Sequence, residues 1–187
     1  MEAGKTGAIK MPNNFDEESM DVITGKCMRV CNQAAADYNS KVYKKKIYFA
    51  GPWFDERAAV LYSCCQNIER AIKLRNKYSI YYPKEEVNNT PHDAFLKNVT
   101  HIHDCDVVVA LVSRKDVGTA WEIGMAYALG KPVYLLGYDR STFLSHTNVM
   151  LAFTGKCFTI DKYAKFLVEG LTESEFVKID NEWEGIE

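Results

Sequence analysis

The stretch DVVVALVSRKDVGTAWEIGMAYALGKPV, residues 106–133, carries the clearest structural pattern in the chain. It opens with Asp106–Val112, an apolar run without polar alternation, which is typical of a strand covered on both faces of a parallel sheet. After a polar loop, the spacing predicts a helix over Gly118–Leu129, with Gly130 in the position that favours a C-cap. Pro132–Gly137 predicts the next strand. The stretch therefore predicts a strand–helix–strand unit with a parallel sheet.

The same alternation continues on both sides of this unit. The sequence predicts further strands over Ile47–Pro52, Tyr78–Tyr82 and Cys157–Ile160. It predicts helices over Asp55–Ile72, His92–His103, Ser141–Phe153 and Tyr163–Leu171, and a loop over Lys84–Pro91. Strands that alternate with helices are joined by right-handed crossovers and form parallel sheets. We therefore predict an α/β fold, a doubly wound five-stranded parallel sheet of the flavodoxin or Rossmann-like kind, with strand order 2-1-3-4-5 and helices on both faces.

The two ends of the chain lie outside this pattern. Residues 1–43 are predicted to be a flexible leader followed by a helical extension, because apolar residues recur at helical spacing from Asp16 to Tyr38. Residues 44–171 form the predicted α/β domain, and residues 172–187 a polar tail. A length of 187 residues fits one such domain.

The composition excludes several classes of partner. Lys and Arg number 23 against 25 Asp and Glu, and a net charge of −2 predicts neither a nucleic acid polymer nor an anionic membrane as partner. No apolar run approaches the ~20 residues that span a bilayer, and the first residues lack a secretory h-region. We therefore expect a cytoplasmic protein. The six cysteines have no metal-ligand spacing, so we expect thiols and no metal site.

Candidate chemistry lies where the strands of such a sheet end, since ligands bind beyond their carboxyl ends. Thr119 is expected to cap the helix there, with Glu122 in its first turn, near the positive end of the helix dipole. On a surface helix such a glutamate only supports the cap. Tyr48, however, lies on the first strand, and its hydroxyl is expected to reach Glu122 because first and third strands are commonly neighbours. A carboxylate held by a phenol and helix amides should stay charged, which suits a nucleophile toward a sugar carbon. Asp116 places a second carboxylate nearby.

Four segments of this sequence share order and spacing with one enzyme family. They are Ile47–Phe54, Asp106–Ala110, Asp116–Ala128 and Gly130–Val133. Together they resemble the nucleoside 2-deoxyribosyltransferase family over about Lys45 to Ile160. The triplet Asn148-Val149-Met150 resembles the Asn-x-Met that members of the nucleoside-using branch lend to a neighbouring subunit's site.

The resemblance implies that Glu122 attacks C1′ of a 2′-deoxynucleoside and that a second base then attacks the opposite face, with retained configuration. Tyr48 would orient Glu122, while Asp116 and Asn148 of the partner subunit would hold the sugar hydroxyls. The other substrate-binding residues that it implies are Gly51, Trp53, Phe54, Asn98, Gly118 and Met150, with Trp53 and Phe54 as walls of the base pocket. It implies no cofactor and no metal, deoxynucleosides and free nucleobases as partners, and a homo-oligomer.

Asn98 departs from the family pattern, which usually has Asp eight residues ahead of Asp106. An asparagine can hydrogen-bond a base but cannot protonate it, so Asp93, Asp104 or water would serve, or the base preference is altered. Two alternative functions stay open. One is an N-glycosidase that hydrolyses a deoxynucleoside or its 5′-monophosphate, although Pro52–Asp55 replaces the Gly, Ser and Arg-rich phosphate loop of nucleotide-hydrolysing relatives. The other is a non-catalytic nucleotide-binding module.

Overall fold

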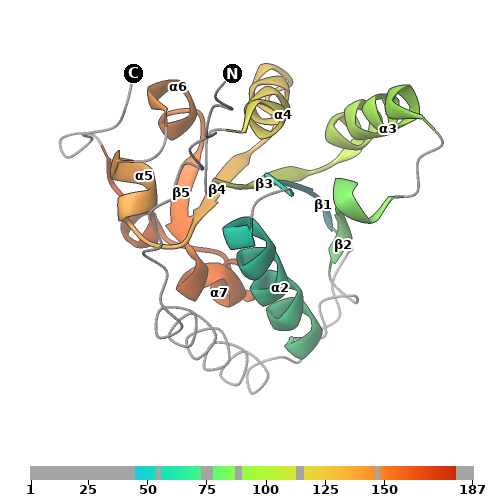
Figure 1. Cartoon of the computed structure of the whole chain (residues 1–187). Helices are drawn as coiled ribbons and strands as arrows, with labels where there is room; N and C mark the ends of the chain where they lie inside the picture. The colour runs from blue at the N-terminus through green and yellow to red at the C-terminus, as the bar shows by residue number, and fades with distance from the viewer. Residues whose placement is uncertain are drawn as a thin grey trace, which may run out of the picture.

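The computed structural model contains one parallel sheet, built from the part of the chain that it describes: residues 45–53, 56–72, 78–86, 90–112, 116–145 and 148–179. The strands are β1 (Lys45–Ala50), β2 (Tyr78–Tyr81), β3 (Val107–Leu111), β4 (Val133–Gly137) and β5 (Lys156–Thr159). They are all parallel and lie in the order β2-β1-β3-β4-β5 (Figure 1). This order confirms the predicted fold class.

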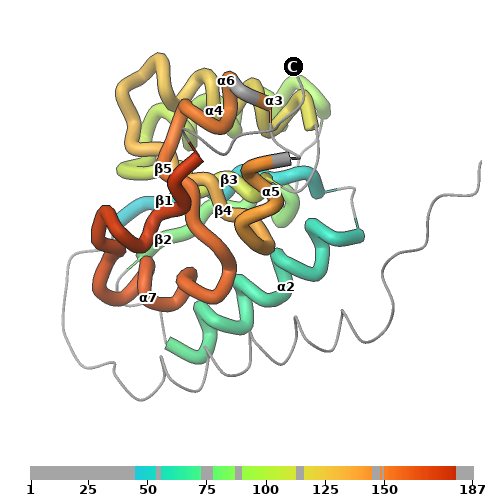
Figure 2. Tube along the Cα trace, turned by 90° about the vertical axis from the view of Figure 1, so that its left-hand side faces the viewer, coloured from blue at the N-terminus to red at the C-terminus, as the bar shows by residue number. Residues whose placement is uncertain are grey.

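Helices cover both faces of the sheet. In the two views, α3 (Pro91–Asp104), α4 (Val117–Ala128) and α6 (Val149–Ala152) lie over one face, and α2 (Glu56–Ala71) and α7 (Tyr163–Val168) over the other (Figures 1 and 2). The apolar core divides in the same way, because successive side chains of a strand point to opposite faces. Ile47 and Phe49 of β1 pack with α2 and α7, whereas Tyr48 and Ala50 pack with α3 and α4.

The prediction of a single helix over Ser141–Phe153 is wrong. The structure has two short helices there, α5 (Ser141–Ser145) and α6. Asn148 begins α6, since its side-chain oxygen accepts a hydrogen bond from the amide of Met150 at 2.8 Å and its carbonyl accepts from Leu151 and Ala152. A short polar side chain that bonds its own backbone competes with a continuous helix, and this competition explains the break.

Two glycines mark helix ends. Gly130 follows α4 with φ +67°, which confirms its predicted place at the C-terminus of that helix. Gly170, with φ +85°, follows α7, which ends at Val168 rather than at the predicted Leu171. Ile160 belongs to a 3₁₀ helix, η3 (Ile160–Lys162), instead of the last strand, where it was predicted. Two other 3₁₀ turns are η2 (Pro83–Glu85) and η4 (Glu173–Glu175).

The segment after α7 packs on the sheet over the residues that are described. The ring of Phe176 stacks on Tyr134 with 6.0 Å between centroids, the amide of Val177 donates to the carbonyl of Cys157 at 2.8 Å, and Ile179 is buried. The leader and helical extension predicted for residues 1–43 lie outside the described residues. Within the described ranges, no helix combines the length and the apolar character that crossing a membrane requires.

Candidate active site

A buried tyrosine–glutamate pair joins β1 to α4. The hydroxyl of Tyr48 donates a hydrogen bond to Oε1 of Glu122 at 2.5 Å. Tyr48 is fully buried and Glu122 is only 8% exposed. The contact forms because β1 pairs directly with β3, with Tyr48 opposite Val108, and α4 returns over the same face after β3. The predicted contact between the two side chains is therefore confirmed.

Asp116 caps α4. Its Oδ2 accepts hydrogen bonds from the amide and the hydroxyl of Thr119, at 2.6 and 2.7 Å. The expectation that Thr119 is the cap is wrong, since Asp116 has the extended backbone of an N-cap and Thr119 lies in the first turn as the donor. Because the helix begins at Val117, Glu122 lies beyond the first turn, and its predicted first-turn position is wrong as well.

Burial raises the pKa of Glu122 to about 7. The hydrogen bond from Tyr48 lowers this pKa, and the negative charge of Asp116 raises it. A pKa of about 7 leaves Glu122 only partly ionised at neutral pH, which differs from the expectation of a carboxylate that stays charged, and burial is the largest cause. Burial and the nearby Glu122 charge raise the pKa of Tyr48 well above its usual range, so Tyr48 stays a donor.

Tyr81 extends the pair into a chain of contacts. In the parallel register Tyr81 of β2 lies opposite Tyr48, and their rings stack with 5.5 Å between centroids. The ring of His101 stacks on Tyr81 at 3.6 Å, and the Tyr81 hydroxyl donates to Oδ1 of Asn98 at 3.1 Å. A chain of contacts through Tyr48 and Tyr81 thus links Glu122 to Asn98. Sequence reasoning gave Tyr81 no role, although the predicted 2-1-3 order already placed its strand beside Tyr48.

Trp53 lies with the α2 layer. Its amide donates to the carbonyl of Gly51 at 3.0 Å, and its ring covers Gly51 so closely that a Cβ there would lie 3.1 Å from the ring. The ring contacts Tyr62 and Tyr82 edge-on, at 5.2 and 6.4 Å between centroids. No described contact joins Trp53 to Glu122, and Phe54 lies outside the described residues. The pocket walls predicted for these two residues stay a prediction.

The remaining predicted residues lie near the ends of helices in the α4 layer. Gly118 is exposed in the first turn of α4, where a Cβ would stand 3.3 Å from Oδ2 of Asp116. Met150 is 75% exposed on α6. No described contact joins Asn148 or Met150 to Glu122 of the same chain, and the roles predicted for them in a neighbouring subunit's site stay a prediction.

Comparison with known proteins identifies the family. The family model of the nucleoside 2-deoxyribosyltransferases matches residues 47–181, which is more than half of the chain. The chain belongs to this family. The matched range contains Tyr48, Asp116 and Glu122, as well as the packed segment after α7.

Individual relatives of this family member are more distant. The 5-hydroxymethyl-dUMP N-hydrolase of Rattus norvegicus is 31% identical over 80 residues, which cover 43% of this chain and 49% of that protein. The Mus musculus protein of the same name is equally identical, with 46% of its length covered. The match thus spans about half the length of these curated relatives. A solved 2-deoxyribosyltransferase from Bacillus psychrosaccharolyticus has a TM-score of 0.52 at 24% identity, over 69% of this chain and 93% of that one, and shows the same fold.

Among the described residues, no group of three His, Cys, Asp or Glu side chains is arranged to hold a metal ion. Cys64, Cys65, Cys105 and Cys157 are buried thiols. The site that the structure does present is the Tyr48–Glu122 pair with Asp116 beside it. Its carboxylate ionises near neutral pH, and such a group can act as a nucleophile or as an acid–base group.

Proposed function

We propose that this protein transfers 2-deoxyribose from a 2′-deoxynucleoside to another nucleobase. The observation that carries the proposal is the state of the Glu122 carboxylate. Tyr48 holds Oε1, while Oε2 has no hydrogen-bond partner among the residues that the structure describes. One oxygen is therefore fixed and the other is available to attack, which is the arrangement that a carboxylate nucleophile needs.

The proposed reaction is a retaining double displacement. In the first step Glu122 Oε2 forms a bond to C1′, and the bond between C1′ and the base nitrogen breaks with its electron pair on the base, which takes up a proton. In the second step a nitrogen of the incoming base attacks C1′ from the opposite face and loses its proton, and the glutamate leaves as carboxylate. Two inversions at C1′ retain the configuration.

Asp116 is proposed to bind a sugar hydroxyl. Thr119 occupies its Oδ2, whereas Oδ1 has no hydrogen-bond partner in the described part of the chain. The cap therefore fixes the carboxylate while one oxygen can still accept a hydrogen bond from substrate. Free deoxynucleosides are favoured over their monophosphates, because residues 51–55 after β1 include the acidic Asp55 and no basic residue, and an acidic loop would repel a phosphate.

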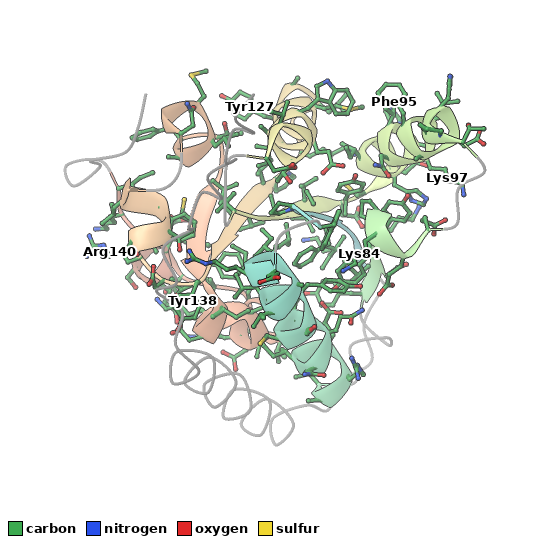
Figure 3. All side chains as sticks on the ribbon, viewed as in Figure 1. Lys84, Phe95, Lys97, Tyr127, Tyr138 and Arg140 are labelled. Atoms are coloured by element: carbon green, nitrogen blue, oxygen red, sulfur yellow. The ribbon has the colours of Figure 1, made fainter. Side chains whose placement is uncertain are left out.

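A homo-oligomer is part of the proposal, in which Asn148 and Met150 of the partner subunit complete the site. The outer side of α4 supports it, since Val117, Trp121 and Tyr127 are 83%, 47% and 64% exposed and the only charged residue of that helix, Glu122, is buried. Figure 3 shows Tyr127 on α4 and Phe95 on α3 along the same outer face. Apolar helix faces of this kind are usually covered. Trp121→Glu is expected to lower the mass measured by light scattering, relative to the parent protein.

Hydrolysis is the second candidate, and one observation favours it. The rat and mouse relatives are N-hydrolases, and they share 31% identity with 80 residues of this chain. Water would then replace the second base in the same mechanism. A nucleotide-binding module without catalysis is the remaining alternative.

Incubation with thymidine and adenine separates these functions. Chromatographic detection of deoxyadenosine and thymine supports transfer, thymine without a new nucleoside supports hydrolysis, and unchanged thymidine supports neither. Glu122→Ala should abolish both reactions, while the control Glu169→Gln changes an exposed glutamate and should leave them intact. Full transfer by Glu122→Ala would contradict the proposed nucleophile.

A further inference from the structure

Tyr81 is held on two sides in front of Asn98. One face of its ring stacks on Tyr48 at 5.5 Å, and His101 of α3 stacks on Tyr81 at 3.6 Å with an interplanar angle of 15°. Rings stacked at these distances restrict the rotation of the tyrosine about χ1 and χ2. The hydroxyl therefore has a defined position, where it donates to Oδ1 of Asn98 at 3.1 Å.

The backbone at this point is fixed as well. Tyr82, the next residue, points to the opposite face of the sheet, where its hydroxyl donates to Oε1 of Glu69 on α2. Its ring also packs on Phe49 at 5.0 Å. Because the end of β2 is anchored on the α2 side, the backbone that carries Tyr81 cannot shift away from Asn98 without breaking contacts in both layers.

The hydrogen bond determines which edge of the Asn98 amide is left over. A side-chain amide has one accepting oxygen and one donating NH₂ group. The Tyr81 hydroxyl donates to Oδ1 at 3.1 Å, and burial raises its pKa to about 12, so it stays a neutral phenol. With Oδ1 engaged in this way, Nδ2 is the edge left for other partners.

Asn98 lies within reach of a substrate on Glu122. Tyr48 donates to Glu122 at 2.5 Å and stacks on Tyr81 at 5.5 Å, and Tyr81 in turn donates to Asn98, so a short chain of contacts links the amide to that carboxylate. A nucleobase attached to C1′ extends several ångströms from the attacked carbon. The Asn98 amide, one hydrogen bond beyond Tyr81, is thus placed to contact the edge of that base.

We propose that Tyr81 is a positioning residue that turns the NH₂ group of Asn98 toward the nucleobase, so that the site selects bases with a carbonyl oxygen over bases with an amino group at that edge. The inference rests on the proposed deoxynucleoside site. A carbonyl accepts from Nδ2, whereas an amino group would place two donors against each other and leave both unpaired. Such a mismatch corresponds to about tenfold weaker binding or more.

Binding to the Glu122→Gln protein tests the inference without turnover. Calorimetry would compare 2′-deoxyinosine with 2′-deoxyadenosine, and 2′-deoxyuridine with 2′-deoxycytidine, which differ by a carbonyl or an amino group. We expect the carbonyl nucleoside to bind about tenfold more tightly in at least one pair. Adding Tyr81→Phe keeps the ring stack but frees the amide to flip, so the ratio should fall to within about twofold of one.

Two further variants complete the test. Asn98→Asp replaces the NH₂ group with a second accepting oxygen, while Tyr81 still donates to the first. The variant should therefore reverse the preference, toward bases with an amino group. Tyr78→Phe makes the same change at the start of β2 and should leave the ratio unchanged. The Asn98→Asp result remains decisive if Tyr81→Phe lowers the thermal stability.

The outcomes separate the inference from the proposed function. Equal binding of carbonyl and amino nucleosides, a ratio that survives Tyr81→Phe in a folded protein, or a ratio that survives Asn98→Asp overturns the inference while the nucleoside site stands. If no deoxynucleoside binds at all, the proposed function fails, and the inference fails with it.

Discussion

Two glutamates, one on each face of the sheet, have similar electrostatics and different surroundings. Glu122 lies in the α4 layer and accepts a hydrogen bond from Tyr48, whereas Glu69 lies in the α2 layer and accepts from Tyr82 and Tyr163. Burial raises the pKa of both carboxyls to about 7. A raised pKa alone therefore does not distinguish a reactive group from a structural one in this protein.

The contacts of each carboxylate make the distinction. The two hydroxyls on Glu69 come from the end of β2 and from α7, so this side chain ties three elements together. Glu122 accepts a hydrogen bond from one hydroxyl and lies within electrostatic range of the Asp116 carboxylate. It belongs to α4, the helix that follows the central strand β3. We infer that Glu69 stabilises the fold and that Glu122 reacts, and four experiments test this difference between the two residues.

The largest expected effect is on activity. Glu122→Gln should lower kcat/KM by at least about a thousandfold, since it removes the nucleophile, while the matched Glu69→Gln should stay within about threefold of the parent. Steady-state kinetics of either reaction, transfer or hydrolysis, measures both values. A loss with Glu69→Gln as large as with Glu122→Gln, in a protein that is still folded, would falsify the distinction.

The pH dependence should follow Glu122. Its carboxyl must be ionised to attack, and a pKa of about 7 leaves roughly a tenth of it ionised one unit below. We expect kcat/KM to rise about tenfold between pH 6 and pH 8. Glu69→Gln should keep this rising limb of the pH profile. Loss of the limb in that variant would show that it reports Glu69 and not Glu122.

Removal of the phenol should move the same limb. The Tyr48 hydrogen bond lowers the pKa of Glu122, so Tyr48→Phe should shift the limb to higher pH and lower kcat/KM several-fold at pH 7. The matched control is Tyr163→Phe, which removes a hydroxyl from Glu69 and should not shift the limb. Unchanged profiles in Tyr48→Phe would mean that the phenol does not tune the carboxylate.

The smallest expected effect is on stability. Both carboxyls have pKa values raised in the folded state above about 4.5, so the unfolded state binds fewer protons and stability is lost as pH rises from about 4.5 through about 7. Glu69→Gln and Glu122→Gln should each flatten this decline. Tm measured at pH 5 and pH 8 should therefore fall less in each variant than in the parent, by a few degrees. An equally steep decline in both variants would contradict the raised pKa values.

The sequence was sufficient for features that depend on pattern and neighbourhood. The unbroken apolar run at β3 and the alternation around it predict the strand order, and that order predicts that Tyr48 meets Glu122. The ionisation of Glu122 was not predictable, because desolvation depends on how α4 packs against the sheet. Tyr81 was missed since its contact requires the register of β2 against β1 as well as the order.

Local competition accounts for other differences. Asp116 and Asn148 each form side-chain bonds to nearby backbone amides, and these bonds decide where α4 and α6 begin. Periodicity of apolar residues does not report such bonds. The sequence also does not decide to which side of the sheet an aromatic residue in a loop turns. Trp53 follows the end of β1, yet its ring packs with the α2 layer.

The adjacent tyrosines at the end of β2 limit how this strand can change over time. Tyr81 contacts Asn98 in the layer of Glu122, and Tyr82 contacts Glu69 in the other layer, because adjacent residues of a strand point to opposite faces of the sheet. A deletion or insertion of one residue within β2 would exchange the two faces of the strand. Tyr81 would then lose its contact with Asn98, and Tyr82 its contact with Glu69. Substitutions in β2 are therefore separable in their effects, whereas a change in its length damages the reactive and the structural layer together.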